Sequence, residues 1–140
     1  MITIRRQEIV KLEDVLHLYQ AVSWTNYTHQ PQMLEKSLSH SLAIYLAHDG
    51  DAVVGLTRLV GDGFSLIFVQ DLIVLPSYQR QGIGSALMRK ALEDFKDAYQ
   101  VQLVTEQTEK NLEFYRSLGF ETLSTYDCTG MIWVDRKKIK

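Results

Sequence analysis

The sequence predicts an α+β fold, with a mixed, mostly antiparallel central sheet flanked by about four helices. Short extended runs separated by Gly and Asp residues, between positions 42 and 75, indicate an antiparallel meander. Apolar residues recur at helical spacing in other segments, and one later strand follows a helix. The 140 residues are 46% hydrophobic and contain no repeat or linker pattern, which predicts a single domain spanning 1–140.

The N-terminal elements follow from the period of the apolar residues. Residues 2–6 alternate apolar and polar side chains, as a half-buried strand does. Residues 11–22 place their apolar side chains on one helical face. A second, short helix is expected to begin at Pro31, because proline suits the first helical turn.

Three extended runs follow, at 42–49, 52–60 and 64–75, connected by the short turns "DGD" and "GDG". The third run is the longest and most apolar, so we place it centrally, buried on both faces.

The C-terminal half begins with a helix from about Ile83 to Phe95. A strand at 101–106 should be parallel to the central strand if the intervening helix makes a right-handed crossover. Thr108 is placed to cap a helix that Gly119 ends. Residues 120–125 and 130–134 predict two closing strands.

Charge and composition restrict the function. A net charge of −2 gives no positive field for nucleic acid or an anionic membrane, and no apolar run approaches the roughly 20 residues of a membrane span. A single cysteine, Cys128, and a start without the apolar core of a signal peptide favour the cytoplasm. The histidines, at positions 17, 29, 40 and 48, lack metal-ligand spacing, so no metal is expected.

The loop within "VLPSYQRQGIGSALMRKAL" joins a strand to a helix through Gly82 and Gly84. Free N–H groups of the first helical turn, together with the helix dipole, would make this loop an anion site. Alternatively, the glycines serve only the turn. Ser85 follows Gly84 without an intervening lysine, which excludes a P-loop, and Leu87 replaces the third glycine of a dinucleotide fingerprint.

The stretch Gln79-Arg80-Gln81-Gly82-Ile83-Gly84 resembles the Q/R-x-x-G-x-G/A acetyl-CoA signature of the GNAT superfamily of N-acetyltransferases. "FYRSLGF", residues 114–120, is similar to the second signature of that superfamily, and two ordered signatures are more specific than one. "VSWTNYT", "QDLIV" and "TGMIWV" resemble a compact subfamily that includes the plant chloroplast serotonin N-acetyltransferases.

The resemblance implies acetyl-CoA as the acyl donor and assigns its contacts. The pantetheine arm would lie along the central strand, and the pyrophosphate would bind the main chain of the following loop. The cofactor-binding residues carried over are Leu72, Ile73, Val74, Gln79, Arg80, Gln81, Gly82, Ile83, Gly84, Ser85, Thr108 and Tyr115. Thr108 departs from the family pattern, which often has asparagine there, so its hydroxyl either contacts the cofactor or caps the helix.

Acetyl transfer needs a neutral amine and a proton for the departing thiolate. Because an alkylammonium has a pKa of about 10.4, a base must accept its proton. Asp71 is the candidate base, and the alternative is a structural carboxylate bound to a backbone or hydroxyl partner. Tyr115 matches the family tyrosine that protonates the coenzyme A sulfur, and the alternative is a tyrosine packed on the sheet. His29 is a second candidate base.

Trp24, Tyr27 and Asp71 are the expected substrate-binding residues, because aromatic walls and a carboxylate suit a cationic amine. The alternative for the aromatic residues is packing in the core. The expected reaction is direct transfer of acetyl from acetyl-CoA to a primary amine of a small molecule, in a ternary complex. A protein or peptide acceptor, or a non-catalytic regulatory acyl-CoA-binding module, is the alternative. A covalent relay through Cys128 ranks behind these. The apolar "GMIWV" segment favours a homodimer through the closing strands.

Overall fold

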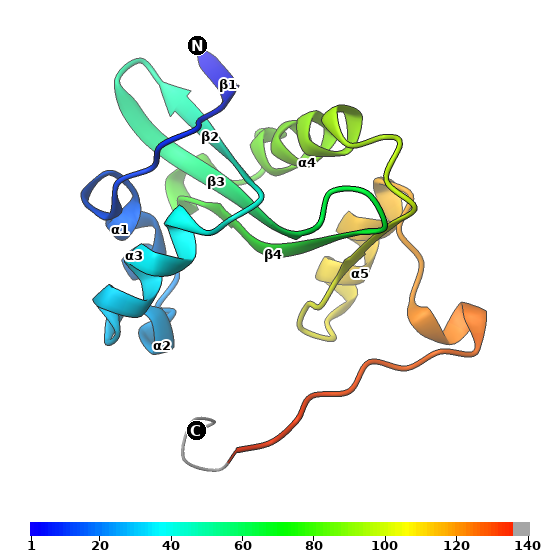
Figure 1. The fold of residues 1–140 in the computed structure, drawn as a ribbon. Coiled ribbons are helices and arrows are strands. Elements are labelled where there is room, and N and C mark those ends of the chain that lie inside the picture. The colour runs from blue at the N-terminus through cyan, green and yellow to red at the C-terminus, as the bar shows by residue number, and fades with distance from the viewer. Residues whose placement is uncertain (136–140) are drawn as a thin grey trace. The chain divides into compact units, whose positions relative to one another are not determined.

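The computed structural model describes residues 1–135, and its backbone groups into two compact units, Met1–Leu103 and Val104–Lys140 (Figure 1). The first, called the N-terminal unit below, holds a five-stranded sheet and four α-helices. The described part of the second, the C-terminal unit, holds one α-helix and a short 3₁₀ helix.

The sheet has the order β1-β2-β3-β4-β5. Neighbouring strands are antiparallel from β1 to β4, and β5 is parallel to β4. The bounds are β1 Ile2–Arg6, β2 Ala43–Asp49, β3 Ala52–Gly61, β4 Leu66–Val74 and β5 Gln100–Leu103. The predicted meander and the predicted parallel strand after the crossover helix are therefore confirmed.

The helices of this unit are α1 Leu12–Ala21, α2 Thr25–Thr28, α3 Pro31–Ser39 and α4 Ile83–Asp94, with a 3₁₀ turn η1 at Pro76–Tyr78. Proline occupies the first turn of α3 as predicted, where its missing N–H costs nothing. The sequence did not predict α2, because a single turn is too short to show a period of apolar residues. Within residues 1–135, no helix combines the length and apolar character needed to cross a bilayer.

Helices cover both faces of the sheet. Leu56 of β3 and Ile73 of β4 belong to a core cluster that includes Val15, Leu18 and Tyr19 of α1. Gly55, the neighbour of Leu56, points to the opposite face, where a Cβ on it would lie 3.2 Å from Leu87 of α4. Because successive strand residues face opposite sides, α1 and α4 lie on opposite faces of the sheet.

The expectation that the third extended run is buried on both faces is wrong. Along β4, buried residues alternate with half-buried or exposed ones, whereas β3 is continuously buried from residue 54 to residue 59. The reason is position: β3 lies in the middle of the sheet, between β2 and β4, while β4 has only the four-residue β5 on its other side. Apolar character alone does not distinguish these two neighbouring strands.

In the C-terminal unit, α5 spans Glu109–Ser117. The Thr108 hydroxyl accepts a hydrogen bond from the backbone N–H of Asn111 at 3.2 Å, so the predicted cap is confirmed. Gly119 follows the helix with a φ of +98°, the left-handed conformation that favours glycine.

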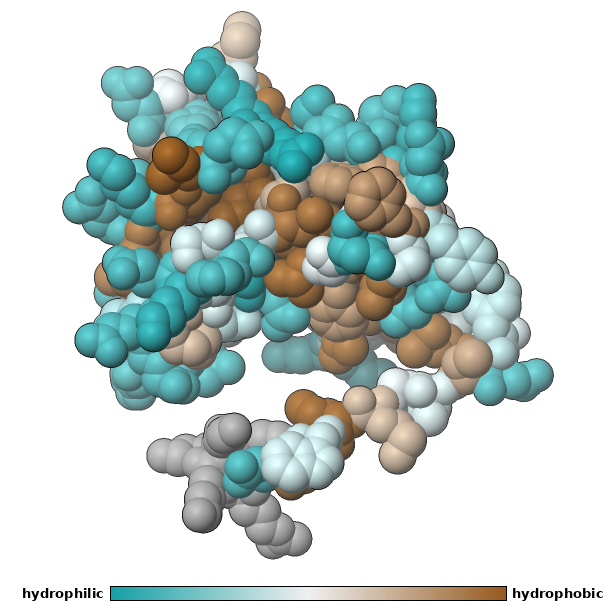
Figure 2. Space-filling model, viewed as in Figure 1, coloured by the Kyte–Doolittle hydropathy of each residue, from teal (hydrophilic) through white to brown (hydrophobic). Residues whose placement is uncertain are grey.

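The two closing strands predicted at 120–125 and 130–134 are not formed in the described structure. Residues Leu123–Tyr126 form the 3₁₀ helix η2 instead, and residues 127–135 form neither helix nor strand. Local hydrogen bonds, such as that from Thr125 N to Thr122 O at 3.0 Å, satisfy the backbone where a strand would need a neighbour. Residues Met131 to Val134 expose their apolar side chains, and apolar surface is visible along this last described stretch (Figure 2).

Candidate active site

Strand β4 contains a bulge at Gln70. Arg58 of β3 pairs with Asp71 and the next residue of β3, Leu59, pairs with Val69, so that Gln70 has no partner in the register. Pairing of β4 with β5 also stops here, since the last pair is Val69 with Leu103. Within the N-terminal unit, the outer edge of β4 therefore has no strand neighbour from Gln70 onward, and its backbone groups can pair with an extended ligand.

The strand edge leads directly to the loop with the two glycines. Val74, the last residue of β4, accepts a hydrogen bond through its carbonyl from Gln79 Nε2 at 3.1 Å, which ties the loop to the strand. The side chain of Ile73 is 1% exposed and packs in the core, so only its backbone can contact a ligand. The predicted strand and loop residues thus lie along β4, the loop after it and the start of α4.

The loop geometry presents the N-terminus of α4 without a side-chain cap. Gly82 precedes the helix with a φ of +80°, and apart from its chain neighbours no atom of residues 1–135 lies within 4 Å of the position that a Cβ would take. Arg80 also has a positive φ, of 66°. The first N–H groups of this twelve-residue helix receive no side-chain oxygen, so these N–H groups and the helix dipole can bind an anion such as phosphate.

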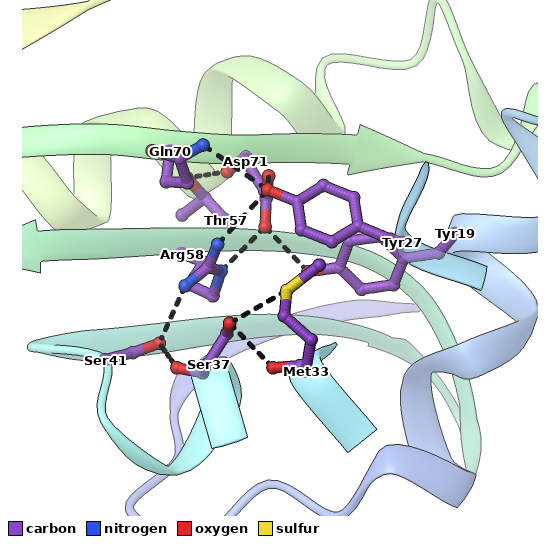
Figure 3. A network of polar contacts seen from close by, with 9 residues as sticks. All are labelled: Tyr19, Tyr27, Met33, Ser37, Ser41, Thr57, Arg58, Gln70 and Asp71. Atoms are coloured by element: carbon purple, nitrogen blue, oxygen red, sulfur yellow. Dashed lines mark hydrogen bonds and ion pairs between the residues drawn. The ribbon is translucent and has the colours of Figure 1, made fainter. Parts of the chain in front are cut away.

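Asp71 lies at the centre of a polar network on the face covered by α1 (Figure 3). Its Oδ2 accepts hydrogen bonds from Arg58 Nε at 2.7 Å and from Tyr19 Oη at 2.8 Å, and its Oδ1 accepts one from Tyr27 Oη at 3.3 Å. Its backbone carbonyl accepts from Thr57 Oγ1 at 3.0 Å. Of the two alternatives that the sequence left open, these hydroxyl contacts match the structural carboxylate.

The network is buried and charged. The side chains of Arg58 and Asp71 are only 5% and 1% exposed. Burial is the largest single influence on the pKa of Arg58 and lowers it, but the charge and hydrogen bond of Asp71, together with the nearby Tyr19 and Tyr27, leave that pKa above its usual value. Burial, and then the charge of Asp71, raise the pKa of the Tyr19 phenol well above its usual range. Tyr19 therefore stays a neutral hydrogen-bond donor.

The predicted acceptor-side residues Trp24 and Tyr27 lie with Tyr19 in one aromatic group. The ring of Tyr19 is 5.3 Å from that of Tyr27 and 6.1 Å from that of Trp24, centroid to centroid. Tyr27 is half-buried, and its oxygen also accepts hydrogen bonds from Gln70 Nε2 at 3.3 Å and Arg58 Nη2 at 3.4 Å. The structure thus brings together Trp24, Tyr27 and Asp71, as expected from the sequence.

Four residues of this network, Tyr19, Thr57, Arg58 and Gln70, were not predicted as site residues from the sequence. A signal for Arg58 was present, because it interrupts the apolar run 52–60 with a positive charge, as Asp71 interrupts the next run with a negative one. Opposite charges within adjacent buried strands must be paired, which would have predicted this contact. Nothing in the sequence indicated the bulge that turns Gln70 toward Tyr27.

Tyr115 and Thr108 belong to the C-terminal unit. The ring of Tyr115 makes edge contacts with Phe114 at 5.0 Å and Phe120 at 5.9 Å, and burial raises the pKa of its phenol. A tyrosine with an ordinary pKa of about 10 is already protonated at neutral pH, so this shift leaves the hydroxyl in the protonated form that a proton donor requires. The side chain of Thr108 is engaged as the cap of α5.

Two other candidates have unremarkable surroundings. Cys128 is exposed, and its Sγ donates a hydrogen bond to the carbonyl of Tyr126 at 3.4 Å. His29 follows the last turn of α2 and is exposed. Within residues 1–135, neither has a hydrogen-bond partner that would activate it as nucleophile or base.

Comparison with known proteins assigns the chain to a protein family. The family model of the acetyltransferase (GNAT) domain matches residues 40–122, which include β2 to α5 with the bulge and the glycine loop. The chain therefore belongs to the GNAT family of acetyltransferases.

Individual relatives agree with that assignment. A GNAT family acetyltransferase of Streptococcus pneumoniae TIGR4 is 78% identical, and its structure matches with a TM-score of 0.90 over 97% of this chain and 99% of that one. The chloroplast GCN5-related N-acetyltransferase 1 of Arabidopsis thaliana is 27% identical over 138 residues, 96% of this chain and 58% of that protein. The chloroplast serotonin N-acetyltransferase 2 of Oryza sativa subsp. japonica is 30% identical over 95 residues, 65% of this chain and 48% of that protein.

The resemblance to GNAT enzymes, the similarity to plant serotonin N-acetyltransferases and the α+β GNAT fold are thus confirmed. The chain spans only about half the length of the two chloroplast relatives.

Proposed function

We propose that this protein transfers an acetyl group from acetyl-CoA to a primary amine of a small molecule, by direct attack in a ternary complex. One observation carries the proposal: the edge of β4 from Gln70 to Val74, which has no strand neighbour within the N-terminal unit, is followed through η1 and the glycine loop by the N-terminus of α4, which has no side-chain cap. An extended arm with amide groups fits the strand edge, and a pyrophosphate fits the helix N-terminus. Acetyl-CoA has both parts, in this order.

The residues for the donor follow from this fit. Backbone groups of Leu72 and Val74 would pair with the amides of the arm. The main chain from Arg80 to Ser85 would take the pyrophosphate, where Gly82 leaves the approach open. The Arg80 guanidinium adds positive charge at the rim. The reactive thioester then lies at the other end of the arm, near the bulge at Gln70.

The reaction forms a bond between the amine nitrogen and the acetyl carbon, breaks the carbon–sulfur bond, and leaves a thiolate that must take a proton. We assign that proton to the Tyr115 hydroxyl, whose raised pKa keeps it protonated until charge develops on sulfur. The proton lost by the attacking amine passes to water or a base. The contacts of Asp71 favour a positioning role over direct proton transfer, because both its oxygens already accept hydrogen bonds.

The acceptor would bind beside Trp24 and Tyr27, whose rings suit an amine on an apolar body. A small acceptor agrees with the net charge of −2, which does not attract polyanions. We further propose that both units form one N-acetyltransferase domain, that the protein is cytoplasmic, and that it assembles as a homodimer.

The test is release of free thiol from acetyl-CoA in the presence of a panel of amines, peptides and aminoglycosides. Wild type should turn over one amine class, and Tyr115→Phe should lower kcat by about 10²-fold. Tyr126→Phe is the matched control, because Tyr126 is 69% exposed on the same unit, and it should keep full activity. Tight binding of acetyl-CoA without thiol release for any acceptor would favour the regulatory acyl-CoA-binding module instead.

A further inference from the structure

We infer that Gln70 orients the acceptor amine: its side-chain carbonyl Oε1 accepts a hydrogen bond from the amine, and a buried ion pair fixes the direction of that carbonyl through Tyr27. The inference deepens the proposed function and rests on it. The chain of contacts runs from Arg58 to Asp71, from Asp71 to Tyr27, and from Tyr27 to Gln70 (Figure 3).

The first step is the ionised state of Asp71. A buried arginine 2.7 Å from Oδ2 holds the side chain as a carboxylate, and a carboxylate only accepts hydrogen bonds. Tyr19 donates to the same oxygen at 2.8 Å. The remaining oxygen, Oδ1, therefore also requires a donor.

Tyr27 supplies that donor. Its hydroxyl has one proton, and the contact with Asp71 Oδ1 at 3.3 Å uses it. The phenol oxygen can then only accept from its other neighbours, and Arg58 Nη2 donates to it at 3.4 Å.

The amide of Gln70 is oriented by this arrangement. Because Tyr27 has no second proton, the group of Gln70 that faces it at 3.3 Å must be the donor, Nε2. The carbonyl Oε1 is thereby turned away from the network. Gln70 is exposed, and within residues 1–135 no hydrogen bond reaches Oε1.

The position of Gln70 gives this free acceptor a use. It is the bulged residue of β4 and the first one beyond the last pair with β5, so it lies where the strand edge opens. With the pyrophosphate at Arg80 to Ser85, the thioester end of the donor reaches this point of the strand. A carbonyl oxygen here can hold one N–H of an approaching amine and direct the nitrogen lone pair at the acetyl carbon.

The test compares Gln70→Ala, Tyr27→Phe and the double variant. Binding of each amine of the panel is measured by calorimetry in the presence of coenzyme A, which needs no turnover, and KM and kcat are measured where turnover is found. Gln70→Ala should weaken amine binding about tenfold, the effect of losing one hydrogen bond, without changing the affinity for coenzyme A. Tyr27→Phe should weaken amine binding less, because it only frees the amide to turn.

The double variant is decisive. If Tyr27 acts through Gln70, the double variant binds the amine no more weakly than Gln70→Ala alone. Gln32→Ala, an exposed glutamine on α3, is the control and should match wild type. Additive losses, or unchanged amine binding in Gln70→Ala while wild type still acetylates amines, would overturn the inference and leave the proposed function standing. Failure of every amine to bind wild type would overturn both.

Discussion

Arg58 of β3 and Asp71 of β4 are register partners, and their side chains form an ion pair with 2.7 Å between Nε and Oδ2. The pair is almost fully buried beneath α1, where Tyr19 and Tyr27 complete the hydrogen bonds of the carboxylate. A buried charge pair contributes little net stability compared with an apolar pair, but removing one partner leaves the other charge uncompensated. This asymmetry makes the pair testable.

Arg58→Met and Asp71→Leu should each lower the free energy of unfolding by about 3–5 kcal/mol, because each leaves one buried charge unpaired. The double variant should lose clearly less than the sum of the two, since no buried charge remains. Urea unfolding at pH 7 measures all three. Additive losses would mean that the two side chains do not interact.

The control for this cycle is Glu93→Gln, which removes the exposed ion pair of Glu93 with Lys96 at 3.6 Å. Both side chains are more than half exposed, so the free energy of unfolding should change by less than about 0.5 kcal/mol.

A second prediction concerns the attachment of α4 to the sheet. The hydroxyl of the buried Tyr45 on β2 donates to Asp94 Oδ2 at the end of α4, at 2.8 Å. Tyr45→Phe should lower the free energy of unfolding by about 1.5–3 kcal/mol, the usual range for a hydrogen bond to a charged group. Tyr99→Phe, at a position 81% exposed, should change it little.

The same contact has a defined pH dependence. Burial, followed by the hydrogen bond to Asp94, raises the pKa of Tyr45, whereas the hydrogen bonds from Tyr45 and Lys90 outweigh burial and lower the pKa of Asp94. A raised tyrosine pKa stabilises the fold below the unfolded value of about 10, and a lowered aspartate pKa stabilises it above about 3.9. The advantage of wild type over Tyr45→Phe should therefore be constant near neutrality, and decline as pH rises above 10 or falls below 4. An advantage that does not change between pH 2 and pH 11 would contradict this.

How much of the fold the sequence predicts depends on where the stabilising contacts lie. The strand at residues 2–6 and the meander could be predicted, because the alternation of apolar and polar residues and short Gly-Asp turns are local signals. The closing strands predicted at 120–125 and 130–134 are not formed in the described structure, because a strand depends on a neighbour that its own residues do not encode. The prediction of which strand is buried on both faces was wrong for the same reason, since the burial of β3 and β4 follows from the order of strands in the sheet.

The residues of the candidate site likewise fall into those that local sequence predicts and those that only the fold brings together. Its glycine loop has a local sequence signature, so Gln79 to Ser85 could be assigned from sequence. Asp71 could be singled out, but its role could not, because Tyr19 and Arg58 come from α1 and β3 and meet it only in the fold. The orientation of Gln70 depends on a register shift in β4, and no pattern of residues in the sequence predicts that shift.

A third prediction concerns the turn between β3 and β4. The carboxylate of Asp62 accepts hydrogen bonds from the backbone N–H groups of Phe64, Ser65 and Leu66, at 2.8, 2.8 and 3.1 Å. The Ser65 hydroxyl and these N–H groups lower the pKa of Asp62. A lowered pKa means stability that is present above the unfolded pKa of about 3.9 and is lost as pH falls toward the folded value.

Asp62→Ala should therefore lower the urea midpoint at pH 7, and the difference from wild type should shrink progressively below pH 4. Asp62→Asn should be intermediate at pH 7, because its amide oxygen can still accept from the turn but carries no charge. Equal midpoints of wild type and Asp62→Ala at pH 7 would contradict a stabilising role for this carboxylate.

The last prediction separates the two explanations of the glycines before and within α4. Gly82 has a φ of +80° with open space around it, so Gly82→Ala should strain the backbone by about 1–2 kcal/mol and destabilise the fold without a steric clash. Gly84 lies in the first turn of α4, where alanine is the better helix former, so Gly84→Ala should stabilise the fold by about 0.4–1 kcal/mol.

Gly82→Ala and Gly84→Ala should change stability in opposite directions, but both should weaken ligand binding. If the start of α4 binds the pyrophosphate of acetyl-CoA, an added methyl group at either position weakens that binding, by moving the N–H groups at Gly82 or by blocking the approach at Gly84. Calorimetry with coenzyme A, beside urea unfolding of the same samples, measures both quantities. A Gly84→Ala variant that is more stable but binds coenzyme A more weakly shows that glycine serves the ligand, whereas unchanged affinity in both variants means that the glycines serve only the turn.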